Sequence, residues 1–337
     1  MKNILITGGA GYIGSHTAVE LIKAGFNPII IDDLSNSQQT VLERLREITG
    51  KEIPFYFGDC GDRSLLNKIS EDFELSGVIH FAAFKAVGES TQEPLKYYKN
   101  NVGSLLVLLE FMEDLGIPDL VFSSSCTVYG QPDTLPVTED TPRKEAESPY
   151  GNTKKVCEDI LVDLIKSKSG LRIISLRYFN PIGAHLSGKI GELPSGVPNN
   201  LVPFVTQTAA GIREKLTVFG DDYDTPDGSC VRDFIHVVDL ADAHVKALEF
   251  LENKPTSFYE VFNVGTGNGN TVLEVIQTFE EVNGLKLNYE IGSRRPGDVV
   301  KIWADTSKIN KVLGWYPQYS LADSLRDSWN WEKNLKN

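Results

Sequence analysis

The stretch Asn3-Ile-Leu-Ile-Thr-Gly-Gly-Ala-Gly-Tyr-Ile-Gly14 decides the fold. Its first apolar residues are typical of a buried parallel strand, and the apolar spacing in His16–Lys23 predicts a helix. The glycines between them fit G-x-G-x-x-G, and Gly8, Gly11 and Gly14 also fit a variant with three-residue spacing. A strand that turns sharply into a helix and lets a pyrophosphate approach its backbone has no room there for Cβ atoms. The stretch therefore predicts a phosphate-binding loop at the amino end of a helix.

A carboxylate follows the second expected strand. Asn27–Ile31 has the character of a buried strand and is followed by Asp32, 18 residues after Gly14 and near the ~20-residue offset at which a carboxylate meets an adenosine ribose. The charge of Asp32 would repel the extra phosphate of NADP, and no Arg follows in Asp33–Ser37 to accept it. The expected cofactor is therefore NAD. A tight turn of any α/β protein and an ordinary strand-end aspartate are the competing interpretations.

Composition limits the partners that the chain can have. The 337 residues are 41% hydrophobic and 23% charged, as in globular proteins, and the net charge of −13 argues against nucleic acid or an anionic membrane as partner. The first strand begins almost at Met1 and no apolar run has membrane-spanning length, so we expect a cytoplasmic protein. The four scattered cysteines are expected to be reduced, and the histidines show no metal-ligand spacing, so no metal is expected.

Strands alternate with helices as far as about residue 180. Helices are expected at Gln38–Thr49, Arg63–Asp72, Lys96–Leu115 and Thr153–Lys168, and strands at Ile53–Phe57, Gly77–Phe81, Leu120–Ser123 and Arg172–Tyr178. This alternation predicts an α/β fold with a Rossmann-type doubly wound parallel sheet, covered by helices on both faces.

The chain beyond residue 180 is richer in Gly, Pro and Asn and is expected to form a smaller mixed α/β lobe. Short helices are expected at Leu201–Ala210, Val238–Leu251 and Thr271–Val282. The expected domains are residues 1–180, which bind NAD, and residues 181–337, which bind substrate. Segments near 231–265, namely Val231–His236 and Phe258–Val264, are candidates to return to the first domain.

Polar residues follow the expected strands where a doubly wound sheet binds its ligand. Asp59 follows the third strand, Ala82-Ala83-Phe84-Lys85 the fourth, Ser123-Ser-Ser125 the fifth, and Tyr178-Phe-Asn180 the sixth. Each set alone is compatible with ordinary loop chemistry. Together they are expected to surround one site.

The pattern Tyr150-Gly-Asn-Thr-Lys154 carries the chemistry. Residues four apart share one face of a helix, so the Lys154 ammonium is expected near the Tyr150 phenol, where it would lower the phenol pKa towards neutrality. Tyr150 could then take a proton from a substrate hydroxyl while hydride leaves for NAD, with Ser125 hydrogen-bonded to the same hydroxyl. An ordinary helix start after Pro149 is the competing interpretation.

Several motifs together resemble the extended short-chain dehydrogenase/reductase family. They are Thr7-Gly-Gly-Ala-Gly-Tyr-Ile-Gly-Ser-His16, His80-Phe-Ala-Ala-Phe-Lys-Ala-Val-Gly-Glu-Ser90, Ser123-Ser-Ser-Cys-Thr-Val-Tyr-Gly130, Ser148-Pro-Tyr-Gly-Asn-Thr-Lys154, Arg177-Tyr-Phe-Asn-Pro-Ile-Gly-Ala184, Asn199-Asn-Leu201, Val231-Arg-Asp-Phe-Ile-His236 and Arg294-Arg-Pro-Gly-Asp298. Within the family, the chain is similar to enzymes that epimerise carbon 4 of a UDP-sugar. The resemblance implies oxidation by NAD, turnover of a 4-keto sugar and return of the hydride, with no net redox change, in a homodimer formed through the two helices between strands four and six.

The resemblance also implies roles for individual residues. Those expected to contact NAD are Gly8, Gly11, Tyr12, Ile13, Gly14, Asp32, Asp33, Asn36, Ser37, Asp59, Cys60, Phe81, Ala82, Ala83, Lys85, Asn100, Ser123, Tyr150, Lys154 and Tyr178. Those expected to contact the nucleotide sugar are Lys85, Ser125, Tyr150, Phe179, Asn180, Asn200, Leu201, Thr217, Val218, Phe219, Arg232, Arg295, Asp298 and Ile302. Guanidinium groups suit a diphosphate, although Arg232 could instead pair with Asp233 or Asp239, and Arg295 with Asp298.

Two departures and two alternatives stay open. Cys126 replaces a frequent Ala, and Ile302 stands where other members carry a bulky Tyr or a smaller residue, so tolerance of N-acetylated sugars is not decided. A nucleotide-sugar dehydratase would need an Asp-Glu acid/base pair after Ser125, where this chain has Cys126-Thr127, while a decarboxylase is neither indicated nor excluded. A regulatory NAD sensor could dispense with Ser125, Tyr150 and Lys154, and all three are present.

Overall fold

The computed structural model describes residues 1–295 and 298–335. By its internal contacts the chain divides into two compact units. Unit 1 contains Met1–Gly130, Arg143–Tyr178 and Ala241–Phe262, and unit 2 contains Gln131–Pro142, Phe179–Leu240 and Asn263–Asn337.

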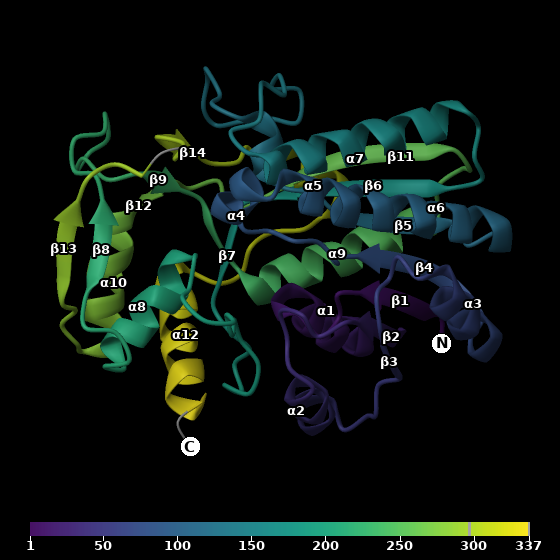
Figure 1. Cartoon of the computed structure of the whole chain (residues 1–337), viewed down its shortest axis with the longest axis horizontal. Helices are drawn as coiled ribbons and strands as arrows, with labels where there is room; N and C mark the ends of the chain where they lie inside the picture. Colours follow the sequence, from purple (N-terminus) through teal and green to yellow (C-terminus); the bar gives the residue numbers. More distant parts are fainter. Residues whose placement is uncertain (296–297, 336–337) are drawn as a thin grey trace. The chain divides into compact units, whose positions relative to one another are not determined.

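Unit 1 is built on a seven-stranded sheet with the order β11-β6-β5-β4-β1-β2-β3 (Figure 1). The strands are β1 (Asn3–Thr7), β2 (Asn27–Asp32), β3 (Phe55–Phe57), β4 (Leu75–His80), β5 (Asp119–Ser123), β6 (Arg172–Tyr178) and β11 (Phe258–Val264). β1 pairs in parallel with both β2 and β4, so the strand order reverses at β1. In a doubly wound sheet, ligands bind at the carboxyl ends of the strands beside such a reversal. The predicted Rossmann-type sheet is confirmed.

Helices cover both faces of this sheet. They are α1 (Tyr12–Lys23), α2 (Thr40–Thr49), α3 (Arg63–Asp72), α4 (Val87–Gln92), α5 (Pro94–Tyr97), α6 (Gly103–Leu115), α7 (Pro149–Lys166) and α9 (Val237–Leu251). Val78 of β4 belongs to an apolar cluster with Leu66 of α3, Leu108 of α6 and Leu161 of α7. A Cβ on the preceding residue, Gly77, would lie 3.2 Å from Leu248 of α9. Because successive strand residues point to opposite faces, α9 covers the face opposite α3, α6 and α7.

The helix expected over Lys96–Leu115 is interrupted, which corrects the prediction. A π-helical turn, Tyr98–Val102, separates α5 from α6 and places the buried Asn101 side chain against the loop after β4. Its Oδ1 accepts from the Phe84 N–H at 2.9 Å, and its Nδ2 donates to the Phe84 carbonyl oxygen at 3.0 Å and to Thr153 Oγ1 of α7 at 3.1 Å. Apolar spacing did not reveal this turn. A π-helical turn adds one residue to a helix, and the helical period of apolar residues is the same before and after it.

Helix α7 begins at Pro149, four residues before the predicted start. The Ser148 Oγ accepts a hydrogen bond from the Gly151 N–H at 3.2 Å, and Pro149 occupies the first helical position, where its missing N–H costs nothing. Tyr150 therefore lies in the first turn of α7, and Lys154 lies one turn further along.

The described residues of unit 2 form three small sheets packed with helices (Figure 1). They are β7 (Asn180–Ile182) with β10 (Phe234–His236), β12 (Asn270–Thr271) with β9 (Val231–Arg232) and β14 (Lys301–Ile302), and β13 (Tyr289–Gly292) with β8 (Leu216–Phe219); the helices are α8 (Leu201–Ala209), α10 (Val272–Asn283), α11 (Ser307–Leu313) and α12 (Leu321–Leu335). Val231–His236 thus stays in unit 2, whereas Phe258–Val264 joins the large sheet. None of the helices in the described part of the chain has both the length and the apolar character that crossing a membrane requires.

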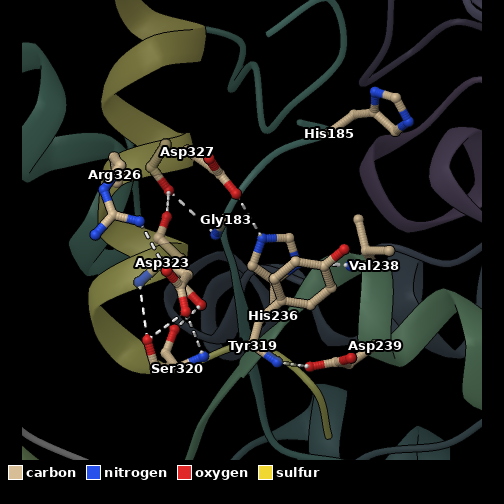
Figure 2. A network of polar contacts seen from close by, with 12 residues as sticks. Gly183, His185, His236, Val238, Asp239, Tyr319, Ser320, Asp323, Arg326 and Asp327 are labelled. Carbon is tan, nitrogen blue, oxygen red and sulfur yellow. Dashed lines mark hydrogen bonds and ion pairs between the residues drawn. The ribbon is translucent and has the colours of Figure 1, made fainter. Parts of the chain in front are cut away.

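A polar network fastens α12 to the β7–β10 pair (Figure 2). The buried His236 ring accepts from the Val238 N–H at Nδ1 (3.0 Å), so its proton sits on Nε2, which contacts the Asp327 carboxylate at 3.3 Å. The ring also stacks on Tyr319 with centroids 4.3 Å apart. A Cβ on Gly183 would lie 2.8 Å from His236, so glycine is required directly after β7. The network holds β7, which begins with Asn180, in a defined place.

Candidate active site

The glycine loop after β1 has the crowding that its sequence predicts. A Cβ on Gly14 would lie 2.4 Å from the Gly8 carbonyl oxygen, and a Cβ on Gly8 would lie 2.8 Å from the Ala82 backbone nitrogen. Gly8 also has a φ of +69°, a left-handed conformation that favours glycine. Helix α1 starts at Tyr12 with no side chain capping its first N–H groups. This backbone can approach an anion closely, at a helix N-terminus whose partial positive charge favours negatively charged ligands.

The buried Asp32 carboxylate connects this loop to the loop after β2. Its Oδ2 accepts from the Ala10 N–H at 3.0 Å, and its Oδ1 accepts from the Leu34 N–H at 2.8 Å and from the Ser37 hydroxyl at 2.9 Å. Burial raises the pKa of Asp32, while these hydrogen bonds act in the opposite direction. The carboxylate is therefore held rigidly at the end of β2, beside the glycine loop.

The loops after β3 and β4 bring further predicted residues to unit 1. The Phe81 N–H donates to the Thr7 carbonyl oxygen at 3.0 Å and the Ala82 N–H to Thr7 Oγ1 at 3.3 Å, so the ends of β4 and β1 lie together. After β3, the Asp59 carboxylate accepts from the Gly61 N–H at 2.7 Å. The other predicted NAD contacts in these loops and nearby are Tyr12, Ile13, Asp33, Asn36, Cys60, Ala83, Lys85 and Asn100.

Ser125 and Tyr150 meet between the end of β5 and the start of α7. Ser125 directly precedes the 3₁₀ turn Cys126–Tyr129, and its side chain accepts from the Thr127 N–H at 3.3 Å and hydrogen-bonds to the Tyr150 phenol. Both side chains are buried, with residue exposures of 6% and 8%. The pair places a hydroxyl and a phenol where they can share one proton.

The Tyr150 pKa is raised rather than lowered towards neutrality as the sequence predicts. Burial raises the pKa of the Tyr150 phenol far above its ordinary value, with the neighbouring Tyr178 as the next cause. The Lys154 Nζ donates instead to the Ser123 carbonyl oxygen at 2.6 Å and lies 5.0 Å from the centre of the Phe122 ring. Burial lowers the pKa of Lys154 to about 8. The four-residue spacing predicted the shared helix but not the desolvation, which depends on what packs around both groups.

Ser123 and Tyr178 extend the cluster to β6. The Ser123 hydroxyl and the Tyr178 phenol are 2.7 Å apart, and burial raises the Tyr178 pKa to about 12. Unit 1 therefore brings together Ser123, Ser125, Tyr150, Lys154 and Tyr178, as expected from their positions at strand ends.

Unit 2 gathers the predicted phosphate-binding arginines around one carboxylate. Arg295 donates to Asp298 through Nε at 3.1 Å and Nη2 at 2.7 Å, and the Arg232 Nη2 lies 3.7 Å from the same carboxylate. Arg232 pairs with neither Asp233 nor Asp239, because those carboxylates accept backbone N–H groups from Thr266, Gly267, Ala304, Gln318 and Tyr319. Two guanidinium groups on one carboxylate leave local positive charge that suits a phosphate.

The other predicted substrate residues of unit 2 lie around this group and elsewhere in the unit. Ile302 pairs with Arg232 between β14 and β9, and the Phe219 ring centre lies 5.6 Å from the Arg295 guanidinium. The Asn180 N–H donates to the Asp233 carbonyl oxygen at 2.9 Å. Asn200 instead donates to Glu192 at 2.6 Å. The remaining predicted contacts are Phe179, Leu201, Thr217 and Val218.

Sequence patterns missed two buried polar residues of unit 1, Asn101 and Glu158, which lie close to the cluster of Ser123, Ser125, Tyr150, Lys154 and Tyr178. Their only local signal is a polar residue at an apolar position of a helix, a pattern that also fits solvent-facing residues. Among the residues described, no cluster of three or more His, Cys, Asp or Glu side chains could hold a metal ion.

Comparisons with known proteins agree with this geometry. A family model described as GDP-mannose 4,6 dehydratase matches residues 5–328. A UDP-glucose 4-epimerase of Neisseria meningitidis is 50% identical over 337 residues, covering 100% of this chain and 99% of its own length. The crystal structure of the Stenotrophomonas maltophila UDP-glucose 4-epimerase, with bound NAD and formylated UDP-arabinopyranose, has a TM-score of 0.97 and 46% identity, with coverage of 100% and 99%. The Bifidobacterium longum enzyme, in complex with NAD+ and UDP, has a TM-score of 0.95 and 45% identity, with the same coverage. With its glycine loop, its Ser-Tyr-Lys cluster and these full-length matches, the chain belongs to the UDP-glucose 4-epimerase family of extended short-chain dehydrogenases/reductases.

Proposed function

We propose that this chain interconverts UDP-glucose and UDP-galactose by epimerisation at carbon 4 of the sugar, with NAD as cofactor. The observation that carries the proposal is the Ser125–Tyr150 hydrogen bond with Lys154 one turn further along α7. This constellation occurs in a chain that is 50% identical, over its full length, to a UDP-glucose 4-epimerase.

The residues of unit 1 fit NAD. The loop Gly8–Gly14 would hold the pyrophosphate, since side chains at Gly8 and Gly14 would collide with the backbone of Ala82 and of the loop itself and so disturb its tight turn, and Asp32 would hold the adenosine ribose. Lys154 and Tyr178 would lie at the nicotinamide end. When bound, NAD would supply the hydride acceptor and donor that oxidation and reduction at sugar carbon 4 require.

Tyr150 is the acid and base of the proposed reaction. Its phenol oxygen would accept the proton of the sugar 4-hydroxyl and later return it, and Ser125 would hold that proton in a shared hydrogen bond. Because burial favours the neutral phenol, Tyr150 needs positive charge nearby before it can accept a proton. With a pKa of about 8, the Lys154 ammonium is charged at neutral pH and supplies that charge from the same helix.

We assign the nucleotide sugar to unit 2 on the same grounds. Arg232 and Arg295 share Asp298 and would bind the diphosphate, whose oxygens match guanidinium forks. Asn180 and Asn200 would contact the diphosphate as well. Leu201 and the β8 residues Thr217, Val218 and Phe219 would contact the uridine, and Phe179 the sugar side. Lys85, a residue of unit 1, is proposed as a further contact of the sugar.

Dehydration is the alternative suggested by the description of the family model. Loss of the 6-hydroxyl needs a carboxylic acid/base pair in addition to the tyrosine, and Ser125 is followed by Cys126 and Thr127. Epimerisation is therefore favoured. Action on UDP-N-acetylhexosamines is a second substrate range, which depends on the room left by Ile302, a buried residue of intermediate size.

We also propose that the enzyme is a cytoplasmic homodimer. Four free cysteines fit a reducing compartment. Helices α6 and α7 are the proposed interface, and Leu106 of α6 is 44% exposed although apolar. Light scattering of the purified protein tests this, and a monomer at every concentration would contradict the dimer.

The decisive experiment is incubation of the purified protein with UDP-galactose and no added NAD, followed by chromatography for UDP-glucose. Conversion is expected because a hydride that returns to the sugar leaves the cofactor in place. No product, even after NAD is supplied, would overturn the function.

A further inference from the structure

Glu158 is a buried carboxylate close to the reacting groups that the proposed mechanism does not use. It lies on α7 one turn beyond Lys154, and its side chain is 1% exposed. Its Oε1 accepts from the Ser124 hydroxyl at 2.6 Å and from Arg177 Nε at 2.9 Å. Its Oε2 accepts from Arg177 Nη2 at 2.7 Å and from Arg143 Nη1 at 3.2 Å. All four contacts are charge-assisted, a class of hydrogen bond that constrains geometry strongly.

The partner of this carboxylate reaches a third element. Arg177 is buried and donates from Nη1 to the Tyr129 hydroxyl at 3.0 Å, with its guanidinium 5.0 Å from the centre of the Tyr129 ring. Tyr129 closes the 3₁₀ turn that begins after Ser125. A single carboxylate thus joins the ends of β5 and β6, the 3₁₀ turn and helix α7.

The contacts of Glu158 end on the chain neighbours of the reacting groups. Ser124 lies between Ser123 and Ser125, and Arg177 immediately precedes Tyr178. We propose that Glu158 is a positioning residue of this enzyme: by holding Ser124 and Arg177 from helix α7, it fixes Ser125 and Tyr178 relative to Tyr150 on the same helix. The inference rests on the proposed epimerase function, because that function defines which arrangement of Ser125, Tyr150 and Tyr178 is productive. The hydrogen bonds themselves do not depend on it.

The negative charge of Glu158 also acts on Lys154. Burial lowers the Lys154 pKa, whereas Cys157 and Glu158 on the same helix raise it. Facing Lys154 from β4 is His80, whose pKa is lowered to about 3 by burial and by the lysine, so it stays neutral near pH 7. A neutral residue at position 158 therefore removes a charge that keeps Lys154 protonated, and it leaves the Arg177 guanidinium buried without its counter-ion.

The chain offers a matched control at the other end of the same strands. Arg172 at the start of β6 donates to Asp119 at the start of β5 through Nε at 2.6 Å and Nη2 at 2.8 Å. This pair has the same forked geometry and joins β5 to β6, but it lies at the amino ends of these strands, away from Ser125, Tyr150 and Lys154. Asp119→Asn therefore measures what loss of a buried ion pair costs the fold alone.

The experiment compares Glu158→Gln, Glu158→Asp and Asp119→Asn as NAD-loaded proteins, with kcat expressed per bound NAD. For Glu158→Gln we expect kcat to fall on the order of 100-fold, as for small displacements of reacting groups, with KM for UDP-galactose unchanged. The basic limb of its kcat–pH profile, which we assign to loss of the Lys154 proton, should move about one pH unit towards acid. In Glu158→Asp the basic limb should lie at its wild-type pH. Asp119→Asn should lose thermal stability but keep the wild-type kcat and the wild-type position of the basic limb.

The inference would be overturned if Glu158→Gln kept both the wild-type kcat and the wild-type position of the basic limb. It would also be overturned if Asp119→Asn lost as much kcat as Glu158→Gln. If Glu158→Gln does not fold, Ser124→Ala removes one contact and leaves the ion pair intact. It should lower kcat without changing KM, and an unchanged kcat would again refute the positioning role.

A second readout separates this inference from the proposed function. In holoprotein labelled with ¹³C at the lysine Cε atoms, the signal missing from Lys154→Arg identifies Lys154, and its titration midpoint should fall in Glu158→Asn and Glu158→Gln but not in Glu158→Asp. A wild type that leaves UDP-galactose unchanged would refute the epimerase assignment. An unmoved midpoint would refute the role of Glu158 whether or not that assignment holds.

Discussion

Replacing Gly14 by alanine tests the glycine loop directly. A helical Gly→Ala change ordinarily stabilises by up to about 1 kcal/mol. At Gly14, however, the new Cβ would lie 2.4 Å from the Gly8 carbonyl oxygen and 2.7 Å from Gly9 Cα, and both are backbone atoms. Overpacking of this kind costs about 1–3 kcal/mol, and here it is relieved only if the loop opens. If that cost falls on the NAD-binding geometry, the Kd for NAD rises about 5- to 150-fold.

Gly103→Ala is the matched control for this prediction. Gly103 begins helix α6, and a Cβ there would meet no atom within 4 Å. It should therefore keep NAD and gain about 0.5–1 kcal/mol in the free energy of unfolding. Calorimetric titration of stripped protein gives the Kd, and thermal unfolding gives the stability. If Gly14→Ala binds NAD as tightly as Gly103→Ala, the loop is not the pyrophosphate cradle and the steric argument fails.

Three further substitutions probe the site. Tyr150→Phe should keep the fold and bound NAD but lower kcat about 10²- to 10⁴-fold, measured with UDP-galactose, because the proposed acid and base is lost; retained activity would identify another base. Lys154→Met should abolish most activity. It should nevertheless raise the free energy of unfolding by about 2 kcal/mol, measured in urea titrations below pH 8. Burial lowers the Lys154 pKa from 10.5 to about 8, which corresponds to a cost of about 3 kcal/mol for burying the ammonium, and the lost hydrogen bond to Ser123 offsets about 1 kcal/mol of the gain. That gain is complete where lysine is charged in both states and disappears as the pH rises through 10.5, where it is neutral in both, so a pH-independent gain would contradict the cause. Ile302→Tyr should reduce turnover of UDP-N-acetylglucosamine more than that of UDP-glucose, because the larger ring fills space beside Arg232; equal losses in kcat/KM would exclude Ile302 as a size filter.

Patterns within one strand-turn-helix segment predicted the structure best. The crowding at Gly14 follows from the turn itself, and Asp32 ends β2 as its position after an apolar run indicated. Helix continuity was harder to predict. The π-helical turn before α6 keeps apolar spacing on both sides, so the sequence pattern indicates one continuous helix. The turn nevertheless places Asn101 against the loop after β4.

Ionisation was the part of the site that sequence spacing misjudged. Tyr150 and Lys154 share one face of α7, as expected, yet burial raises the phenol pKa and lowers that of the amine. Desolvation is a property of everything packed around a group, including Phe122 and Tyr178, which are distant in sequence. No spacing rule within one helix contains that information.

By itself the sequence determined the doubly wound sheet, the phosphate loop, the carboxylate at the end of β2 and the Tyr-Lys pair, because each depends on residue types within a short stretch of chain. Only the tertiary structure decided which distant polar groups meet. It paired Glu158 with Ser124 and Arg177, and brought Arg232 to Asp298. The physical reason is that a buried charge is stable only with its partners, and the partners are chosen by the packing of strands and helices rather than by their order in the chain.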